Sequence, residues 1–499
     1  MSVNYAIGIG GTGAKAIESL VYLCSMGLGP STLRVIFVDP DKSNGNLTRT
    51  RELISRYNEL RAVLGEENIA LGLFKTDIKI FTPDTWTIFE RAGMTLRDFI
   101  NYNLLDKKER DAVDILYTQN ELDTPLDQGF RGHPAIGALV MAILNKNEAP
   151  WLEFWRDMKT TQTAGDFKAF FFGSIFGGTG AAGFPTLTKL VRDAEENQLT
   201  GEKRKAVVGG ALVLPYFSFN PPTDSQSESA KMFVDISNFP VASKAALLYY
   251  FSKELGVDYY YLIGNSFSTN LGEFSIGSAT QKNKADVIEM VSALAALDFY
   301  SQNFSDFNGA NRYFIAQRNK EDLIHWEDLP VPSFGDKTEP ASKYFIRRNI
   351  YFTTFMHAIQ NYFHHEIINN NLKNINSLNW YKNNFEKKKV PLNTADFKDN
   401  LTKLQDFSKL FFNWLDEISL PEEVQLFKMN NIKHNWNSNG TAVSNLFSGF
   451  AESNHHYTKL IKEFNEQSIS EDAKGSLQRL VNLAYKGSEK FSKYNYGLE

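Results

Sequence analysis

Two short glycine-rich segments constrain the fold of this chain more than any other feature. Each follows an apolar run with strand character and precedes residues with helical apolar spacing. The first, residues 8–13, follows the run 5–9, and the second, residues 177–183, follows the run 167–172. Strands that are apolar on both faces are typical of a parallel sheet covered by helices on two sides. The sequence therefore predicts an α/β fold.

The same alternation of strands and helices continues through the first 300 residues. Further strands are predicted at 33–38, 206–214 and 259–263, and helices at 14–26, 184–194 and 242–255. Pro185 suits the first turn of the helix after the second glycine-rich segment, where its missing N–H costs nothing. Beyond a turn-rich stretch near residue 330, the chain becomes rich in asparagine, lysine and aromatic residues with helical spacing. We therefore expect an α/β domain over residues 1–325 and a helix-rich region over residues 326–499.

Composition narrows the class of partner. The formal net charge of −5 gives no general attraction for nucleic acid or anionic lipid, so we expect protein or small-molecule partners and no nucleic acid. The single cysteine excludes an intramolecular disulfide and fits a reducing compartment. No apolar run approaches spanning length, and the first residues lack the pattern of a secretory signal. We expect a cytoplasmic protein without a membrane span.

The glycine-rich segments have the chemistry of phosphate-binding loops. Glycines directly after a buried strand let backbone N–H groups converge on a phosphate, and the following helix points its positive end at the same charge. Residues 8–13 match the dinucleotide fingerprint GxGxxG, and Asp39, at the end of the next strand, is placed to bind a ribose hydroxyl. An NAD(P)-binding Rossmann oxidoreductase is therefore one interpretation, although a single dinucleotide site does not require the second segment. A Walker loop is excluded, because Ala14 separates Gly13 from Lys15.

Four loops, in their order along the chain, give a more specific indication. Segment 8–14 is similar to the first phosphate loop of the tubulin and FtsZ superfamily, and segment 35–40 to the strand and loop that follow it. Segment 132–137 resembles the loop that approaches the terminal phosphate. Segment 176–182, FGGTGAA, is similar to the glycine–threonine loop by which that superfamily is usually recognised.

Weaker similarities extend the match to about residue 300. Segment 213–217 resembles the strand and proline turn beside the ribose, and segment 261–265 resembles a strand that ends in the asparagine contacting guanine. Segment 285–291 looks like the central helix, whose first turn faces the base. The resemblance implies a tubulin/FtsZ-like parallel-sheet nucleotide-binding domain with GTP or GDP as its ligand and Mg²⁺ as the counter-charge.

The resemblance also implies a set of binding residues. On the phosphate and ribose side these are Gly10, Gly11, Thr12, Gly13, Asp39, Gly132, Gly177, Gly178, Thr179 and Gly180. On the base side they are Asn265, Asn283 and Asp286, because a carboxylate can accept both guanine N–H groups that adenine lacks. Segment 283–286, NKAD, also matches the base-reading tetrad of Ras-like GTPases, but the Walker loop of that class is absent. Asn283 and Asp286 are one helical turn apart and would share a helix face. The alternative for both is an ordinary residue at a helix start.

Two departures from the family concern activity. In the family, acidic residues after the central helix complete the nucleotide site of the neighbouring subunit, whereas here Asp306 alone stands near that place. We take Asp306 as the candidate catalytic residue, with a solvated loop aspartate as the alternative. The region after residue 325 does not resemble the family's second domain.

The sequence therefore predicts a guanine-nucleotide-binding protein that self-associates, with a further protein partner for the C-terminal region. It leaves open whether the chain hydrolyses GTP and forms filaments, or is a non-hydrolysing, nucleotide-gated scaffold. The NAD(P)-dependent oxidoreductase remains the third alternative.

Overall fold

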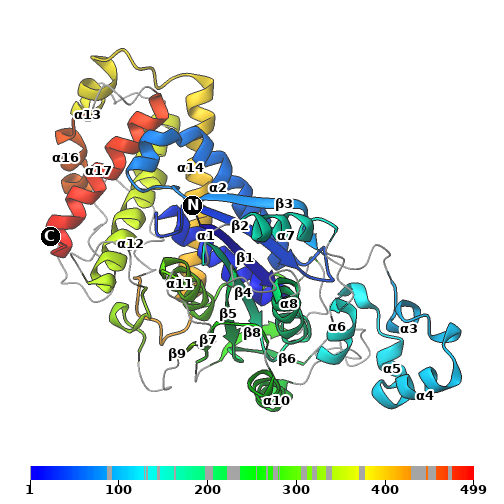
Figure 1. Ribbon diagram of the computed structural model, residues 1–499. Helices are drawn as coiled ribbons and strands as arrows, with labels where there is room; N and C mark the ends of the chain where they lie inside the picture. Colours follow the sequence, from blue (N-terminus) through cyan, green and yellow to red (C-terminus); the bar gives the residue numbers. More distant parts are fainter. Residues whose placement is uncertain are drawn as a thin grey trace.

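The computed structural model of the chain (Figure 1) shows a central sheet with helices on both faces. It describes residues 2–86, 93–128, 130, 133–142, 147–161, 165–196, 206–221, 236–253, 255–265, 268–273, 279, 281–304, 312–316, 323–332, 340–369, 377–428, 446–447, 457–469 and 475–498. None of the helices within these ranges is long and apolar enough to cross a bilayer.

Seven strands form one parallel sheet in the order β3-β2-β1-β4-β5-β7-β9. Their bounds are β1 (Val3–Ile9), β2 (Thr32–Val38), β3 (Asp77–Trp86), β4 (Phe167–Ser174), β5 (Ala206–Val213), β7 (Tyr259–Ile263) and β9 (Arg312–Ala316). The chain moves outward from β1 to β3, returns to pair β4 with β1, and then moves outward in the opposite direction. The reversal between β1 and β4 is the topological switch point at which doubly wound sheets bind ligands.

Residues of the central strands alternate between two separate apolar cores, which is why these strands are mostly apolar. One core, with Ala6 and Phe172, lies against α1 (Gly10–Ser25), α2 (Gly45–Ala70) and α11 (Val287–Ser301). The other, with Ile7 and Phe171, lies against α6 (Pro134–Met141), α7 (Trp151–Thr160), α8 (Gly178–Glu196) and α10 (Phe239–Ser252). The predicted α/β class with a parallel sheet is confirmed.

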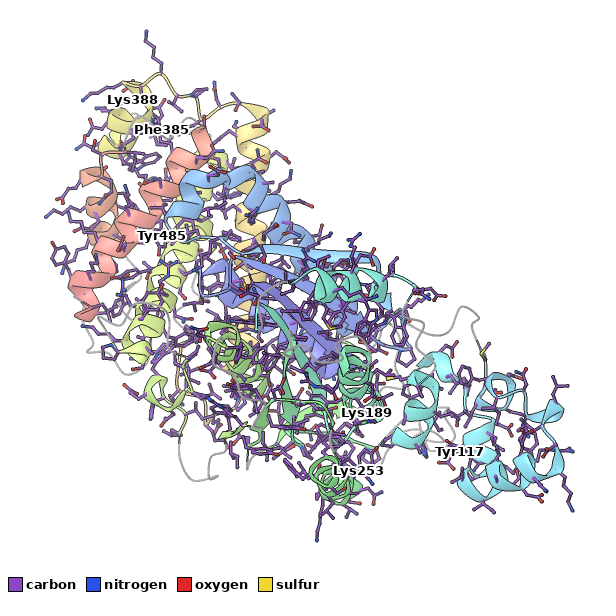
Figure 2. All side chains as sticks on the ribbon, in the orientation of Figure 1. Tyr117, Lys189, Lys253, Phe385, Lys388 and Tyr485 are labelled. Carbon is purple, nitrogen blue, oxygen red and sulfur yellow. The ribbon has the colours of Figure 1, made fainter. Side chains whose placement is uncertain are left out.

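The C-terminal region is helical and continues the first of these cores. Its main helices are α12 (Ala341–Ala358), α14 (Ala395–Ile418), α16 (Tyr457–Glu466) and α17 (Ser476–Tyr496), with the short α13 (Asn379–Tyr381) and π-helical turns at Ile359–Phe363, His365–Asn369 and Lys382–Glu386. Arg348 of α12 donates to Tyr485 of α17 (Figure 2) at 2.7 Å and to the carbonyl of Gly72, just beyond α2, at 2.9 Å. The helix-rich character expected beyond residue 326 is present. Of these helices, α14 and α17 pack on α2, and α14 also contacts α1.

A small helical module stands apart from the sheet. It follows β3 and contains α3 (Leu96–Phe99), α4 (Lys107–Leu116) and α5 (Gln119–Leu122), with 3₁₀ turns at Tyr102–Leu104 and Leu126–Gln128. Tyr117, at the end of α4, labels this module in Figure 2, far from Lys388 at the opposite end of the molecule. A second sheet pairs β6 (Phe217–Asn220) with β8 (Thr269–Glu273).

Most predicted elements of the first 300 residues are confirmed, but the position expected for Pro185 is wrong. The helix begins at Gly178, because the glycines that suggested a loop are its first turn, so Pro185 lies inside α8. A proline there removes the N–H that would bond to the carbonyl four residues earlier. That carbonyl, of Ala181, instead accepts the hydroxyl of Tyr250 from α10 at 2.9 Å. Strands β3 and β9 were not predicted.

Candidate functional site

The two predicted phosphate loops lie side by side at the switch point. β1 and β4 are neighbours in the sheet, so the residues that follow them leave the same edge together. Gly10 has φ +70°, and a methyl group added to it would lie 3.3 Å from Cβ of Thr179. Two segments about 170 positions apart in the sequence thus meet, as the prediction of one shared phosphate site requires.

Glycine is needed in these loops for close backbone approach. A methyl group on Gly13 would lie 2.8 Å from the carbonyl oxygen of Phe172, and one on Gly180 would lie 2.5 Å from that of Ser174. Both distances are too short for a side chain, so these two glycines let α1 and α8 pack directly on the strands. Gly177 and Gly11 are less constrained, with nearest distances of 3.0 and 3.1 Å to side-chain atoms.

The N-terminus of α1 has the electrostatic character of an anion site. Its N-cap is Ile9, which makes no side-chain capping bond, and the first turns of α1 and α8 carry no acidic residue. By contrast, α11 opens with a capping box formed by Asp286 and Glu289. N–H groups without a side-chain cap, at the positive end of a helix, favour a bound anion such as a phosphate.

The segment after β2 lies along the start of α1. Asp39 is 3% exposed, and its carboxylate accepts the N–H of Asp41 at 2.9 Å. Burial raises the pKa of Asp39 to about 8, partly opposed by that hydrogen bond. The amides of Asn44 and Asn46 lie beside Gly11, where a methyl group would come within 3.7 and 3.1 Å of their nitrogens.

The structure gives Asp286 a definite local role at the predicted base side. As N-cap of α11, its carboxylate accepts the N–H of Ile288 at 2.9 Å and the hydroxyl of Thr269 at 2.6 Å. Burial raises its pKa above the ordinary value. The expectation that Asn283 shares a helix face with Asp286 is wrong, because α11 starts at Val287 and Asn283 precedes the cap.

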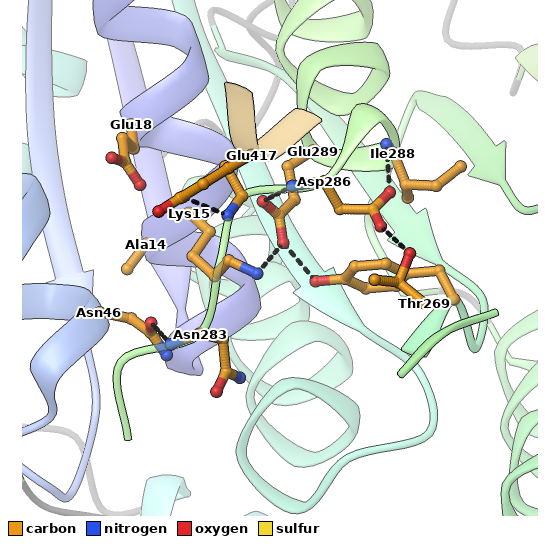
Figure 3. A network of polar contacts seen from close by, with 12 residues as sticks. Ala14, Lys15, Glu18, Asn46, Thr269, Asn283, Asp286, Ile288, Glu289 and Glu417 are labelled. Atoms are coloured by element: carbon orange, nitrogen blue, oxygen red, sulfur yellow. Dashed lines mark hydrogen bonds and ion pairs between the residues drawn. The ribbon is translucent and has the colours of Figure 1, made fainter. Parts of the chain in front are cut away.

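A buried carboxylate joins three parts of the site. Glu289 pairs with the ammonium of Lys15 at 2.5 Å, accepts the Tyr216 hydroxyl at 2.5 Å, and accepts the N–H of Asp286 at 2.9 Å (Figure 3). Tyr216 also bonds to the side chain of Thr12 in the first glycine loop. Burial raises the pKa of Glu289, and the Lys15 charge opposes this shift. Glu289 therefore connects the first glycine loop, the turn after β5 and the start of α11.

Some predicted residues cannot be placed. Gly132 and Asp306 lie outside the described residues. Asn265 follows β7 and is half-buried. Within the described ranges, no group of three or more His, Cys, Asp or Glu side chains is arranged to hold a metal ion.

Sequence reasoning missed several polar residues of this site: Lys15, Asn44, Asn46, Tyr216 and Glu289. Lys15 carries one usable signal, since a cation in the mostly apolar stretch 14–26 needs a buried partner. Its partner is 274 positions later, so the pairing cannot be read from the chain.

Known proteins give little further information about the function of this site. No protein-family model and no curated protein matches the sequence. Among solved structures, the chain is similar to CetZ2 from Haloferax volcanii, described as a GTPgS-bound protofilament, with 17% identity and a TM-score of 0.25. The match covers 53% of this chain and 49% of that protein, about half its length. The residues of the site therefore carry the functional case.

Proposed function

We propose that this chain is a tubulin/FtsZ-like protein that binds GTP or GDP between its two glycine loops and self-associates. The observation that carries the proposal is the close approach of Gly10 and Thr179 at the switch point of the sheet. This arrangement supports a single phosphate site that uses both loops. The sequence resemblance in four successive loops supports a guanine nucleotide as its ligand.

In this proposal the phosphates are held by backbone N–H groups at the starts of α1 and α8, from Gly10, Gly11, Thr12, Gly178, Thr179 and Gly180. The uncapped start of α1 and the absence of acidic residues from both first turns fit an anionic ligand. Bound Mg²⁺ would supply counter-charge to the phosphates, mainly through phosphate and water oxygens. Asp39 would stand on the phosphate or ribose side.

Base recognition would come from Asn265, Asn283 and Asp286. Within the protein, the Asp286 carboxylate accepts from the N–H of Ile288 and the hydroxyl of Thr269, and in the capping box from the N–H of Glu289. A carboxylate offers about four acceptor positions, so guanine donors would use the remaining ones. Because the capping bonds fix the carboxylate, it would be oriented before the nucleotide binds.

Hydrolysis in this proposal needs a second copy of the chain. Lys168, near the start of β4, donates to the carbonyls of Tyr300 and Gln302 at 2.7 Å each, which places the end of α11 at the sheet edge opposite the glycine loops. The 15 residues of α11 span about 22 Å. Asp306 follows Gln302 by four positions, so we propose that it acts on a nucleotide held by a neighbouring copy.

The first test is to denature the purified protein and identify any released nucleotide by chromatography, then to measure binding of added GTP, ATP and NAD. Thr179→Arg should abolish nucleotide binding while the fold is kept, because a long cation would fill the space beside Gly10. Thr186→Arg, the same change further along α8 on a half-buried position, is the matched control. Normal GTP affinity in Thr179→Arg would contradict the proposal.

Two further functions remain as alternatives. An NAD(P)-binding oxidoreductase also fits the strand order and the GxGxxG segment followed by Asp39. Release of NAD from the denatured protein, and a change in the fluorescence of the reduced cofactor on binding, would support this alternative. A nucleotide-gated scaffold would bind GTP without hydrolysis or assembly. Light scattering with and without GTP separates the scaffold from a filament.

A further inference from the structure

The segment that leads into α11 is held by side chains from two other parts of the molecule. Asn44 donates to the side chain of Gln281 at 2.7 Å, and Asn46 accepts the N–H of Asn283 at 2.9 Å. Glu417 accepts the N–H of Ala285 at 2.6 Å. Since Ala285 immediately precedes Asp286, these bonds determine where the cap of α11 lies.

Glu417 comes from the C-terminal region, at the last turn of α14 (Figure 3). One turn earlier, the indole N–H of Trp414 donates to the hydroxyl of Ser19 in α1 at 3.1 Å. The same indole stacks on Tyr22, with ring centroids 4.8 Å apart. The end of α14 is therefore anchored on the helix that begins in the first glycine loop.

Arg49 links Glu417 to α1. Its guanidinium donates to the oxygen of Glu417 that also accepts from Ala285, at 3.3 Å, and pairs with Glu18 of α1 at 2.7 Å. Glu18 is 3% exposed, so one guanidinium is shared by two carboxylates in a mostly buried setting. A charged acceptor strengthens its hydrogen bond to a backbone N–H.

We propose that Glu417 is a positioning residue for the base side of the nucleotide site. It fixes segment 281–286, and through it the carboxylate of Asp286, so that nucleotide affinity depends on how α14 packs against α1. This inference rests on the proposed nucleotide function. Because coupling between two sites is reciprocal, bound nucleotide must in turn stabilise the end of α14.

The hydrogen bond and the charge of Glu417 can be separated by substitution. Glu417→Ala removes both, whereas Glu417→Gln keeps an amide oxygen that can accept from Ala285 and Arg49. Glu422→Ala, which removes an exposed carboxylate just beyond α14, is the matched control. GTP and GDP affinities are measured by calorimetry, and hydrogen exchange is followed in peptides covering 281–288 and 410–418.

We expect nucleotide binding about ten-fold weaker in Glu417→Ala, equivalent to about 1.4 kcal/mol, and within about two-fold of wild type in Glu417→Gln and Glu422→Ala. Exchange in 281–288 should rise in Glu417→Ala alone, and nucleotide should slow exchange in 410–418 of the wild type. Unchanged affinity and exchange in Glu417→Ala would overturn the inference. If Glu417→Ala does not fold, the wild type decides: exchange in 410–418 that bound nucleotide leaves unchanged would overturn the inference instead.

The two proposals fail in different ways. A wild-type protein that binds neither GTP nor GDP refutes the nucleotide function, and with it the role of Glu417 in affinity. A wild type that binds nucleotide, with unaltered affinity and exchange in Glu417→Ala, refutes the role of Glu417 alone.

Discussion

The buried pair between Lys15 and Glu289 predicts a large and specific loss of stability in Glu289→Gln. Both side chains are at most 1% exposed, and their charged atoms are 2.5 Å apart. The substitution keeps the shape of the side chain but leaves the Lys15 ammonium buried without the carboxylate it pairs with. Breaking a buried pair on one side typically costs about 3–5 kcal/mol. We expect a loss of about 3 kcal/mol in the free energy of unfolding.

A double-mutant cycle distinguishes this explanation from simple loss of packing. Lys15→Met removes the cation and keeps an unbranched chain, so Lys15→Met/Glu289→Gln should be about 2 kcal/mol more stable than Glu289→Gln alone. Urea denaturation followed by circular dichroism measures each variant. The exposed pair Lys189 and Asp193, 3.3 Å apart, is the control and should show coupling of about 0.5 kcal/mol or less. Additive effects for Lys15 and Glu289 would refute the reasoning.

Three other predictions follow from single contacts. Burial raises the pKa of Asp39 to about 8, so the folded protein binds a proton more readily than the unfolded chain. The free energy of unfolding should therefore fall as pH rises from about 4 to 8. Asp39→Asn should make the denaturation midpoint depend less on pH, and an identical pH dependence would contradict the prediction. Gly180→Ala places a methyl group against a β4 carbonyl and should cost about 1–3 kcal/mol by urea denaturation, with Gly177→Ala costing clearly less. Tyr250→Phe removes the hydroxyl that donates to the Ala181 carbonyl, which Pro185 leaves without a helix bond, and should cost about 1 kcal/mol. Pro185→Ala restores an N–H for that carbonyl, so Tyr250→Phe should cost less in this background. Equal costs in the two backgrounds would show that the hydroxyl does not compensate for the proline.

The central strands and the glycine loops could be predicted from the sequence because they depend on local patterns. Residues 169–172 are apolar at every position, and this follows from a strand whose residues alternate between two cores. Glycines directly after β1 and β4 indicated the loops, since close packing of helix on strand excludes a side chain at Gly13 and Gly180. The edge strands were missed for the opposite reason: in β9, Tyr313 and Ile315 are 54% and 72% exposed, so the strand lacks the fully buried pattern of the central ones.

The polar side-chain contacts of the candidate site could not be predicted, because they join residues far apart in the sequence. Glu289 lies in a helix that is buried almost all round, and nothing near it indicates whether it would meet Lys15, Tyr216 or solvent. Glu417 lies in a region that the motif analysis treated as separate from the loops, yet it bonds to Ala285, 132 positions earlier. A buried carboxylate requires a cation or several donors, whichever part of the chain supplies them. The sequence can therefore indicate that such partners must exist, while only the packing of α11 and α14 against α1 determines which residues they are.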